Sequence, residues 1–459
     1  MKNMTLAHIA KVTEGKLVLP EGFENLENRE IAGAVNDNRK IEKDFLFIPM
    51  VGTRVDGHDF IPDVFSAGAM ASLSERELNN PAGPYIQVQD TKLALKQIAT
   101  EYRKQLNIPI VGVIGSVGKT STKEMIASVL RTRYKVLKTE GNFNNEIGLP
   151  LTICRITDEH QVAVVEMGIS DFGEMHRLGD IAKPNIVVMT NIGQCHLEFL
   201  KNRDGILKAK TEVFEHMPSD GVVILNGDDD KLIEADTLGL RKIFYGLNGQ
   251  EINAKDVTPK GLSETSATIS AGQEAFEVVI PLPGSHNVMN ALAATAVGRE
   301  LGLTVGDIAN GLSHAETIAG RNNIITIRDV TIIDDCYNAN PVSMKASIEV
   351  LGKAPGRSIA VLGDMGELGD EERQLHYEIG EALENNHIGY VFTVGELSEE
   401  INKSLSQKNS SCMAHHYTSV DAMLEDLLPI VRGCDTILVK ASHFMNFNQV
   451  VEALKKRLS

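Results

Sequence analysis

An apolar run that leads into a glycine-rich loop and then a helix constrains the fold of this chain most strongly. The run IPIVGVIG begins at Ile108, the loop SVGKT follows it, and KTSTKEMIASVLRTR has the pattern of a helix. Continuous apolar runs of this length are typical of strands buried on both faces of a parallel sheet. The pattern therefore predicts an α/β unit with a polar loop at the carboxyl end of one strand.

The loop itself has the chemistry of a phosphate-binding site. Glycines allow backbone N–H groups to approach phosphate oxygens, and the following helix adds its positive dipole. Lys119 would reach the β- and γ-phosphates, and Thr120 would reach a magnesium ion. The full pattern G-x-x-x-x-G-K-[ST] is not met, because Val113 occupies the first glycine position. A glycine-rich turn with a surface lysine is the alternative, but the flanking strand and helix favour a nucleotide site at Gly115, Ser116, Val117, Gly118, Lys119, Thr120 and Ser121.

Later strands supply candidate metal ligands. Glu166 ends the run QVAVVEMG, and His196 follows the next run, PNIVVMTNIG. A magnesium ion needs oxygen ligands besides phosphate and Thr120, and a carboxylate at the end of a neighbouring strand fits that need. A solvated strand end and a structural loop histidine are the plainer interpretations of these two residues.

A lysine on the apolar face of a helix is the least expected feature of the chain. At 3.6 residues per turn, the segment after Asn202 places Lys208 with acidic residues and Lys210 on the apolar face. A charged amine there is costly unless it is paired or neutral. Lys210 could extend its amine to solvent, bind phosphate, or carry a CO₂-derived carbamate that serves as a magnesium ligand. The apolar face consists of Ile206, Val213, Phe214 and Met217.

Composition limits the possible functions. The 459 residues are too many for one ordinary core, and the net charge of −17 disfavours nucleic-acid binding. The five cysteines show no CxxC spacing, and no apolar run approaches the roughly 18 residues of a membrane helix. We therefore expect a cytoplasmic, α/β protein without membrane insertion.

Strand and helix patterns divide the chain into three expected domains. Residues 1–88 show short alternating elements, and 89–318 contain the phosphate loop with an antiparallel insert near 255–280. Residues 319–459 restart the strand–helix alternation with VTIIDDCYNANP, RSIAVLGDMGELG, GYVFTVGE and DTILVKASH. Each of these runs ends in a polar or glycine-rich loop, which is typical of a second open α/β sheet.

Eight ordered motifs resemble one family, the Mur ligases, which form amide bonds in peptidoglycan synthesis. They are GSVGKTS, GNFNNEIGLPLT, VVEMG, HLEF…AKTEVF, LPGSHNVMNALAA, GRNN, IIDDCYNANP and LGDMGELG. The resemblance implies a small UDP-sugar-binding domain, a central ATPase domain and a Rossmann-like C-terminal domain. YNANP and LGDMGELG resemble the member that uses ATP to join D-alanyl-D-alanine to UDP-MurNAc-tripeptide through an acyl phosphate.

The resemblance also assigns roles to single residues. Thr120 and Glu166 would hold one magnesium ion, His196 would hold a second, and Lys210 would be the carbamylated lysine among the metal ligands. Nucleotide contacts outside the loop would come from Asn287, Arg321, Asp335 and Asn338. The substrate would contact Asn38, Arg39, Asn142, Asn144, Asn145, Tyr337 and Lys440, and Asp364 and Glu367 are further substrate-side candidates. Plainer roles are a helix cap for Asn287 and a local turn for Asp335.

Two positions depart from the family pattern, and two other functions compete. KASH, Lys440 to His443, stands where Lys-Gly-Ser-Arg is usual, and Asn38-Arg39 stands where Ser-Arg is common. The alternatives are a sibling ligase, which adds the third stem residue or polyglutamate, and a P-loop protein that only switches on ATP. We expect a monomer.

Overall fold

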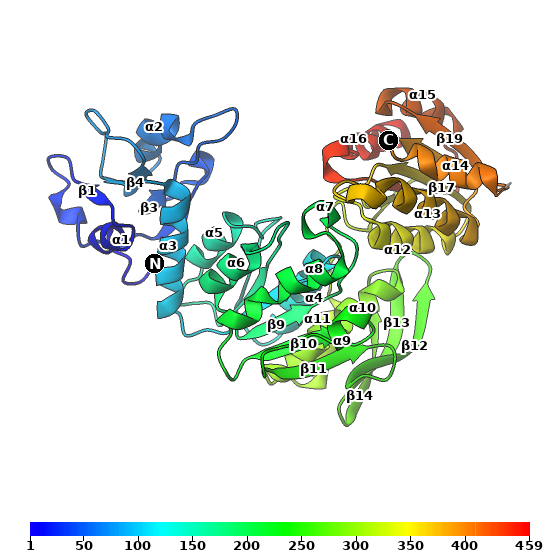
Figure 1. Ribbon diagram of the computed structural model, residues 1–459, viewed down its shortest axis with the longest axis horizontal. Coiled ribbons are helices and arrows are strands. Elements are labelled where there is room, and N and C mark those ends of the chain that lie inside the picture. The colour runs from blue at the N-terminus through cyan, green and yellow to red at the C-terminus, as the bar shows by residue number, and fades with distance from the viewer. Residues whose placement is uncertain (409) are drawn as a thin grey trace.

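The computed structural model describes residues 1–408 and 410–459. These residues form three units in a row, and each unit contains one β-sheet (Figure 1). Within the described ranges, no helix has both the length and the apolar character required to cross a membrane. The α/β class expected from the sequence is confirmed.

The first unit is a small sheet in the order β1-β5-β4-β3-β2, parallel except for the pair β1–β5. Leu46, Leu73 and Ile86 from its central strands are fully buried. The strands are β1 (Lys16–Val18), β2 (Gly33–Val35), β3 (Phe45–Phe47), β4 (Ala71–Ser74) and β5 (Tyr85–Gln87). The helices are α1 (Leu6–Val12) and α2 (Ile61–Ser66), with 3₁₀ turns η1 (Glu24–Leu26), η2 (Asn38–Lys40) and η3 (Gly57–Phe60).

Helix α3 (Thr91–Gln105) joins the first unit to the central one and stands between them in Figure 1. It begins where the Asp90 carboxylate accepts the N–H groups of Lys92 and Leu93. Near its end, the buried Arg103 donates to the carbonyl oxygens of Ala182 (2.7 Å) and Lys183 (3.1 Å). These bonds fix the helix to the central unit.

The central sheet lies within residues 110–280, all of which are described. Its order is β14-β13-β12-β11-β10-β9-β6-β8-β7, and only the pairs β12–β13 and β13–β14 are antiparallel. The expected antiparallel insert is confirmed. The strands are β6 (Ile110–Ile114), β7 (Val136–Lys138), β8 (Val162–Glu166), β9 (Ile186–Met189), β10 (Val222–Asn226), β11 (Arg241–Gly246), β12 (Ile252–Lys260), β13 (Glu264–Ala271) and β14 (Glu274–Ile280).

Helices cover both faces of the parallel part of this sheet. Val111 and Val113 pack against α4, α10 and α11, whereas Ile110 and Ile114 belong to the core on the side of α5, α6 and α8. Burial on both faces explains the continuous apolar run of β6. The helices are α4 (Lys119–Leu130), α5 (Gly148–Cys154), α6 (Glu174–Ala182), α7 (Leu197–Leu200), α8 (Arg203–Thr211), α9 (Asp230–Ile233), α10 (Ser285–Glu300) and α11 (Val305–Ser313), with the 3₁₀ turn η4 (Glu212–His216).

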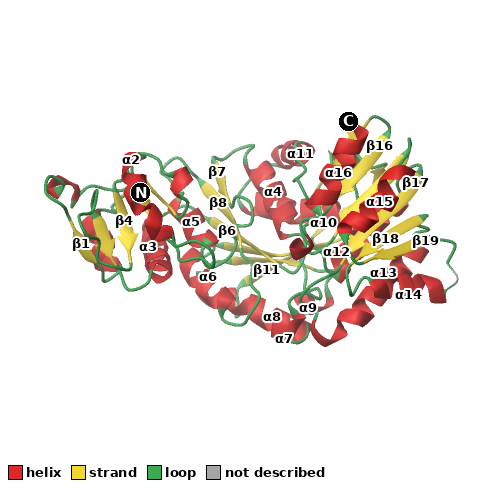
Figure 2. Cartoon of the chain, turned by 90° about the horizontal axis from the view of Figure 1, so that it is seen from above, coloured by secondary structure: helices red, strands yellow, loops and turns green. Residues whose placement is uncertain are grey.

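The third unit is an open sheet in the order β15-β16-β20-β17-β18-β19, with only β15–β16 antiparallel (Figure 2). Ile359 and Val361 pack toward α15 and α16, and Ala360 and Leu362 toward α12 and α13. The strands are β15 (Asn323–Ile327), β16 (Val330–Asp334), β17 (Arg357–Gly363), β18 (Tyr390–Val394), β19 (Met413–Tyr417) and β20 (Asp435–Lys440). The helices are α12 (Pro341–Gly352), α13 (Glu372–Asn385), α14 (Glu399–Gln407), α15 (Val420–Ile430) and α16 (Asn448–Leu458), with η5 (Gly369–Glu371) and η6 (His443–Met445).

The predicted strands of this region are confirmed, but two edge strands were missed. β19 is a partly exposed edge strand with the sequence MAHHY, and β15 is an antiparallel strand before the first predicted run. Edge strands need only one bonded neighbour and one buried face, so their sequences lack the long apolar run of a central strand.

Helix α11 offers a test of packing behind the phosphate-loop helix. A Cβ atom on Gly311 would lie 2.4 Å from the Val129 Cα atom of α4, whereas one on Gly306 would meet only Thr304 Oγ1, at 3.7 Å. We expect Gly311→Ala to destabilise the central unit by about 1–3 kcal/mol through overpacking. Gly306→Ala should be neutral or slightly stabilising, since alanine is the better helix former. Thermal unfolding of both variants checks this, and equal melting temperatures would contradict it.

Candidate active site

The phosphate loop lies where three parallel strands end side by side. β6 pairs with β8 on one side and β9 on the other, so Gly115, Glu166 and Thr190 meet at one edge. Gly115 has a φ of 152°, and a Cβ atom there would lie 1.9 Å from Thr190 Oγ1. Only glycine fits this close approach of loop and strand.

Side chains after β9 hold the loop in shape. Asn191 Oδ1 accepts the Val117 N–H at 3.0 Å, and its Nδ2 donates to the Val117 carbonyl at 3.1 Å. Thr190 Oγ1 donates to the same carbonyl at 2.6 Å. In the sequence, Thr190 and Asn191 are simply the end of the strand run PNIVVMTNIG. Their position directly after the strand neighbouring the loop was the signal that could have identified them.

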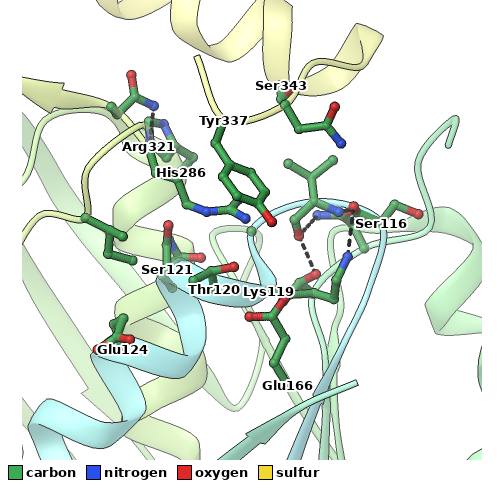
Figure 3. Close-up of a pocket in the computed structure, with 18 of the residues that line it drawn as sticks. Ser116, Lys119, Thr120, Ser121, Glu124, Glu166, His286, Arg321, Tyr337 and Ser343 are labelled. Atoms are coloured by element: carbon green, nitrogen blue, oxygen red, sulfur yellow. Dashed lines mark hydrogen bonds between the residues drawn. The ribbon is translucent and has the colours of Figure 1, made fainter. Parts of the chain in front are cut away.

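Lys119 begins helix α4, and its amine turns back over the loop (Figure 3). Its Nζ atom donates to the carbonyl oxygens of Gly115 (2.8 Å) and Ser116 (3.3 Å). These acceptors are uncharged, whereas a phosphate oxygen would form a stronger, charge-assisted bond with the ammonium. The loop therefore presents a cation and a helix N-terminus to the same space.

Glu166 provides a buried carboxylate with one oxygen unused. Its side chain is 2% exposed, and Oε1 accepts a hydrogen bond from Asn144 Nδ2 at 2.7 Å. Oε2 is buried and has no hydrogen-bond partner among the described residues. A buried, unpartnered carboxylate oxygen is costly unless a cation binds it. Together with the nearby hydroxyl of Thr120, which is also buried, this oxygen donor set fits a magnesium ion.

Lys210 is buried and Lys208 is exposed, as the helical pattern predicted. Burial lowers the pKa of Lys210 to about 8, the positive charge of Lys119 acts in the same direction, and Cys195 opposes them. A pKa near 8 leaves an appreciable fraction of the amine neutral, and so nucleophilic, near pH 7 to 8. The amine therefore differs from that of the exposed Lys208, which is surrounded by solvent.

The expectation of one regular helix through Met217 is wrong. Helix α8 ends at Thr211, and the chain continues as the 3₁₀ turn η4. The Thr211 hydroxyl donates to the carbonyl oxygens of Leu207 and Lys208, and the Glu212 carboxylate accepts the Gly173 N–H at the start of α6. These local side-chain bonds compete with continued α-helix.

His196 contacts the third unit. Its φ of 53° is left-handed, and its Nδ1 lies 2.5 Å from Glu367 Oε2. The hydrogen bond with His196 lowers the pKa of Glu367. The histidine also lines a cavity of about 600 Å³ that includes Lys119, Thr120 and Glu166. The structure thus brings together in one cavity three of the four predicted metal ligands, Thr120, Glu166 and His196, beside Lys119.

The third unit supplies the opposite wall of this cavity. The guanidinium of Arg321 lies 4.0 Å from the centre of the Tyr337 ring, and Figure 3 shows both facing the phosphate loop. Asp335 Oδ2 accepts from Lys440 Nζ at 2.6 Å and from Ser347 Oγ at 2.5 Å. Lys440 is 1% exposed, and its ammonium therefore needs a buried partner. Its bond to Asp335 neutralises and orients that carboxylate. The expected nucleotide contacts Arg321, Asp335 and Asn338 all line the cavity.

A polar chain on α10 connects the cavity to the loop helix. Asn287 Oδ1 accepts from Asn290 Nδ2, and Asn290 Oδ1 accepts from the Thr122 hydroxyl of α4. Asn287 Nδ2 donates to the Pro283 carbonyl, so this residue is not the helix cap. Next to it, burial lowers the pKa of His286. His286 and Asn290 also line the cavity, and the sequence reasoning did not single them out.

The loop of residues 141–145 separates the first cavity from a second one. Asn144 and Asn145 line the 600 Å³ cavity, whereas Phe143 lines a cavity of about 1150 Å³ against the first unit. Asn145 Oδ1 accepts the N–H groups of Ile147 and Gly148, just before and at the start of α5. Asn142 is exposed in the same loop. One short loop therefore contacts both spaces.

The second cavity contains the two predicted residues of the first unit. Asn38 and Arg39 start the turn η2 and line the space together with Phe143 and Arg155. The Arg39 side chain is 83% exposed, and its guanidinium pairs with the Asp37 carboxylate at 2.8 Å. The hydrogen bond from Arg39 lowers the pKa of Asp37. Arg39 therefore places a cation at the edge of this cavity.

The two substrate-side candidates of the third unit differ in placement. Asp364 Oδ1 accepts the Ser398 N–H at 2.7 Å, so its carboxylate serves the interior of the third unit. Glu367 instead reaches across to His196. His443, which replaces the arginine of the family pattern, has its ring 5.6 Å from that of Tyr337.

Comparison with known proteins agrees with this arrangement. The Mur ligase middle domain matches residues 113–298, the glutamate ligase domain of Mur ligases matches 320–443, and the catalytic domain of the Mur ligase family matches 30–116. The UDP-N-acetylmuramoyl-tripeptide–D-alanyl-D-alanine ligase of Bacillus subtilis strain 168 is 39% identical, with 99% of each chain covered. The chain belongs to the Mur ligase family. The resemblance expected from its motifs is therefore confirmed.

Solved structures extend the similarity to three dimensions. A crystal structure of MurF from Acinetobacter baumannii matches this Mur ligase with a TM-score of 0.89 at 30% identity, covering 99% of each chain. MurF from Thermotoga maritima in complex with ADP matches with a TM-score of 0.81 at 31% identity, covering 93% of this chain and 97% of the other.

The segment that carries Glu367 depends on a neutral histidine. His376 is fully buried, its Nε2 accepts the Met365 N–H at 2.9 Å, and burial lowers its pKa. Below the ordinary histidine pKa of about 6.5, the unfolded chain gains a proton here before the folded chain does. His376 should therefore stabilise the fold above about pH 6.5, and that contribution is lost as the pH falls toward the lowered folded pKa.

We expect the stability difference between the native chain and His376→Gln to shrink as the pH is lowered from about 7.5 to about 5.5. Glutamine can accept the Met365 N–H but cannot titrate in this range. Thermal unfolding at a series of pH values measures the difference, and parallel curves for the two proteins would contradict the expectation.

Proposed function

We propose that this chain uses ATP to join D-alanyl-D-alanine to UDP-MurNAc-tripeptide, releasing ADP and phosphate. The strongest structural support is the pair of cavities that share the loop of residues 141–145. One cavity has phosphate-binding chemistry and the other suits a large polar substrate. A carboxylate at the end of that substrate must reach the phosphate loop, and neighbouring residues of one loop line both spaces. The similarity to ligases of this reaction along the full length supports the same conclusion.

We propose domain boundaries at 1–88, 89–318 and 319–459. Each sheet lies within one of these ranges. The first domain would hold the UDP-sugar through Asn38 and Arg39, the central domain would hold ATP, and the third would close over it. Asn142 and its neighbours would contact the muramyl part of the substrate, since their loop lies beside both cavities.

The chain prepares a carboxylate for attack by reducing negative charge around the γ-phosphate. Lys119 and the N-terminus of α4 would bind the phosphates, and Thr120 and Glu166 would hold a magnesium ion. Bound there, magnesium would offset the repulsion between carboxylate and phosphate. Arg321, Asn287, Asp335 and Asn338 would contact the rest of the nucleotide from the opposite walls.

The reaction would proceed in two steps, formation of an acyl phosphate and its attack by an amine. A carboxylate oxygen of the tripeptide attacks the γ-phosphorus, and ADP leaves with the electrons of the broken P–O bond. The amine nitrogen of D-alanyl-D-alanine attacks the acyl carbon, phosphate leaves, and the nitrogen loses a proton. Tyr337 and Lys440 lie on the side from which the third domain would order these substrates and exclude water.

We propose that Lys210 carries a carbamate, formed when its neutral amine attacks CO₂ and releases a proton. Its burial and its pKa of about 8 support an amine that is partly neutral near pH 7 to 8. The carbamate would convert an unfavourable buried cation into an oxygen ligand. With His196 it would hold a second magnesium ion, and Glu367 would orient the histidine ring.

The competing functions have less support. An ATP switch needs no third α/β sheet facing its nucleotide across a cavity, and here that sheet supplies the cavity's opposite wall. A sibling ligase would share the fold, but the motifs YNANP and LGDMGELG and the full-length similarity to the D-alanyl-D-alanine ligase of Bacillus subtilis favour addition of D-alanyl-D-alanine. We place the reaction in the cytoplasm, where ATP and UDP-linked substrates are available and free cysteines persist.

The function is tested by product formation. We expect phosphate release from ATP to require UDP-MurNAc-tripeptide and to be coupled to an amide product only when D-alanyl-D-alanine is present. Phosphate assays and mass spectrometry of the product measure both. Phosphate release that ignores both substrates would support the ATP switch, and an amide product with another amino acid in preference to the dipeptide would support a sibling ligase.

The two lysines of α8 provide a matched test of the carbamate. We expect Lys210→Ala to lower the rate by about 10²–10³, because a charged group of the metal site is lost. Short carboxylic acids should restore part of this activity by filling the space with a carboxylate. Lys208→Ala, on the exposed face of the same helix, should retain nearly full activity. A Lys210→Ala enzyme with intact activity, or a worse effect of Lys208→Ala, would contradict the assignment.

A further inference from the structure

A cluster of two histidines and two acidic residues lies on the surface of the central unit, outside both cavities. His176 and Asp180 are one turn apart on α6, and Glu215 and His216 are in η4, which packs against α6. Figure 1 shows α6 beside α8, the helix that leads directly into η4. None of these four residues is used by the proposed reaction.

The candidate ligand atoms of His176, Glu215 and His216 lie within 4.8 Å of one another. His176 Nδ1 lies 3.1 Å from His216 Nε2 and 3.2 Å from Glu215 Oε2. One ring nitrogen thus faces two potential acceptors and can donate at most one proton to them. Atoms that share a tetrahedral zinc ion at 2.0–2.1 Å lie about 3.3 Å apart, which is close to both observed distances.

A carboxylate also lies near the other nitrogen of His216. His216 Nδ1 is 3.9 Å from Asp180 Oδ1, an ion-pair distance that a small rotation of the Asp180 side chain would shorten to a hydrogen bond. Metal-binding histidines usually direct the second ring nitrogen to a carboxylate, which fixes the tautomer and the ring orientation. Nε2 of His216 faces His176 and is therefore the nitrogen available to a metal.

The helix beneath the cluster accommodates the His216 ring. A Cβ atom on Gly179 would lie 2.8 Å from His216 Cδ2 and 3.3 Å from its Cγ. Glycine weakens the interior of a helix, but here it allows the ring to lie directly on α6. On the other side of the junction, the Glu212 carboxylate accepts the N–H groups of Gly173 and His176. The backbone that carries the cluster is therefore held in place from both elements.

We propose that His176, Glu215 and His216 form a binding site for a divalent transition metal of the Zn²⁺ class, with Asp180 orienting His216. Two imidazoles and one carboxylate favour such ions over Mg²⁺, which prefers oxygen ligands. The metal would fasten α6 to η4, directly after the helix that carries Lys210. Three protein ligands on an exposed surface leave the fourth position to water, so the ion can exchange with solution.

The site is tested by Zn²⁺ binding to the full chain, measured by equilibrium dialysis in excess Mg²⁺. We expect one Zn²⁺ per chain to be lost in the double variant His176→Ala/His216→Ala. Asp180→Asn should weaken binding by about 10–100-fold, as loss of an orienting carboxylate does, and Glu215→Gln should weaken it further. The control is His314→Ala, which removes an exposed histidine at the end of α11. This variant should bind Zn²⁺ as the native chain does.

A spectroscopic measurement distinguishes zinc bound at this site from zinc bound to the free thiols or to Glu166. X-ray absorption at the zinc edge should show two imidazole ligands and oxygen ligands, and Zn²⁺ should raise the melting temperature of the native chain but not of the double variant. Zinc bound through sulfur, equal binding by the double variant, or equal loss in His314→Ala would overturn the proposal. Unchanged binding by both Glu215→Gln and Asp180→Asn would overturn it as well.

Discussion

The site depends on one constraint: the carboxylate of Glu166 is buried, and its negative charge requires cations nearby. One oxygen is held by Asn144 and the other is left without a partner in the region that the structure describes. A negative charge in that position is tolerable only if cations gather around it, and Lys119 lines the same cavity. Lys210 is buried close enough to Lys119 for the two charges to interact. A buried carboxylate, a half-buried ammonium and a buried amine are thus gathered at the end of one sheet, where water is scarce and electrostatic effects on a phosphate are large.

Strand order explains why these groups meet. β6 lies between β8 and β9, so the phosphate loop, Glu166 and the Thr190–Asn191 pair leave the sheet at adjacent positions. In parallel sheets the carboxyl ends of the strands share one edge, and ligands bind there. The third unit has the same arrangement. Asp335 follows β16, Lys440 ends β20, and these two strands are parallel neighbours in the sheet. The 600 Å³ cavity is formed where these two edges face each other.

The sequence indicated much of this arrangement because its signals are local. The phosphate loop is a contiguous run between an apolar strand and a helix, and the inward direction of Lys210 follows from helical periodicity within one turn. Polar contacts between distant segments had no such signal. The pair of His196 and Glu367 joins residues 171 positions apart, and the chain Thr122–Asn290–Asn287 connects two helices. Asp364 was expected near substrate, but its carboxylate bonds the Ser398 N–H inside the third unit.

The sequence by itself determined the α/β class, the phosphate loop, the strand-end position of Glu166 and the burial of Lys210. All of these follow from residue types over a few neighbouring positions, where backbone geometry leaves few choices. Tertiary structure alone decided that the loop of residues 141–145 borders two cavities, that Lys440 neutralises Asp335, and that α8 gives way to a 3₁₀ turn beside α6. These features depend on which side chains from distant segments satisfy one another's charges and hydrogen bonds. The periodicity of residue types along one segment does not identify such partners.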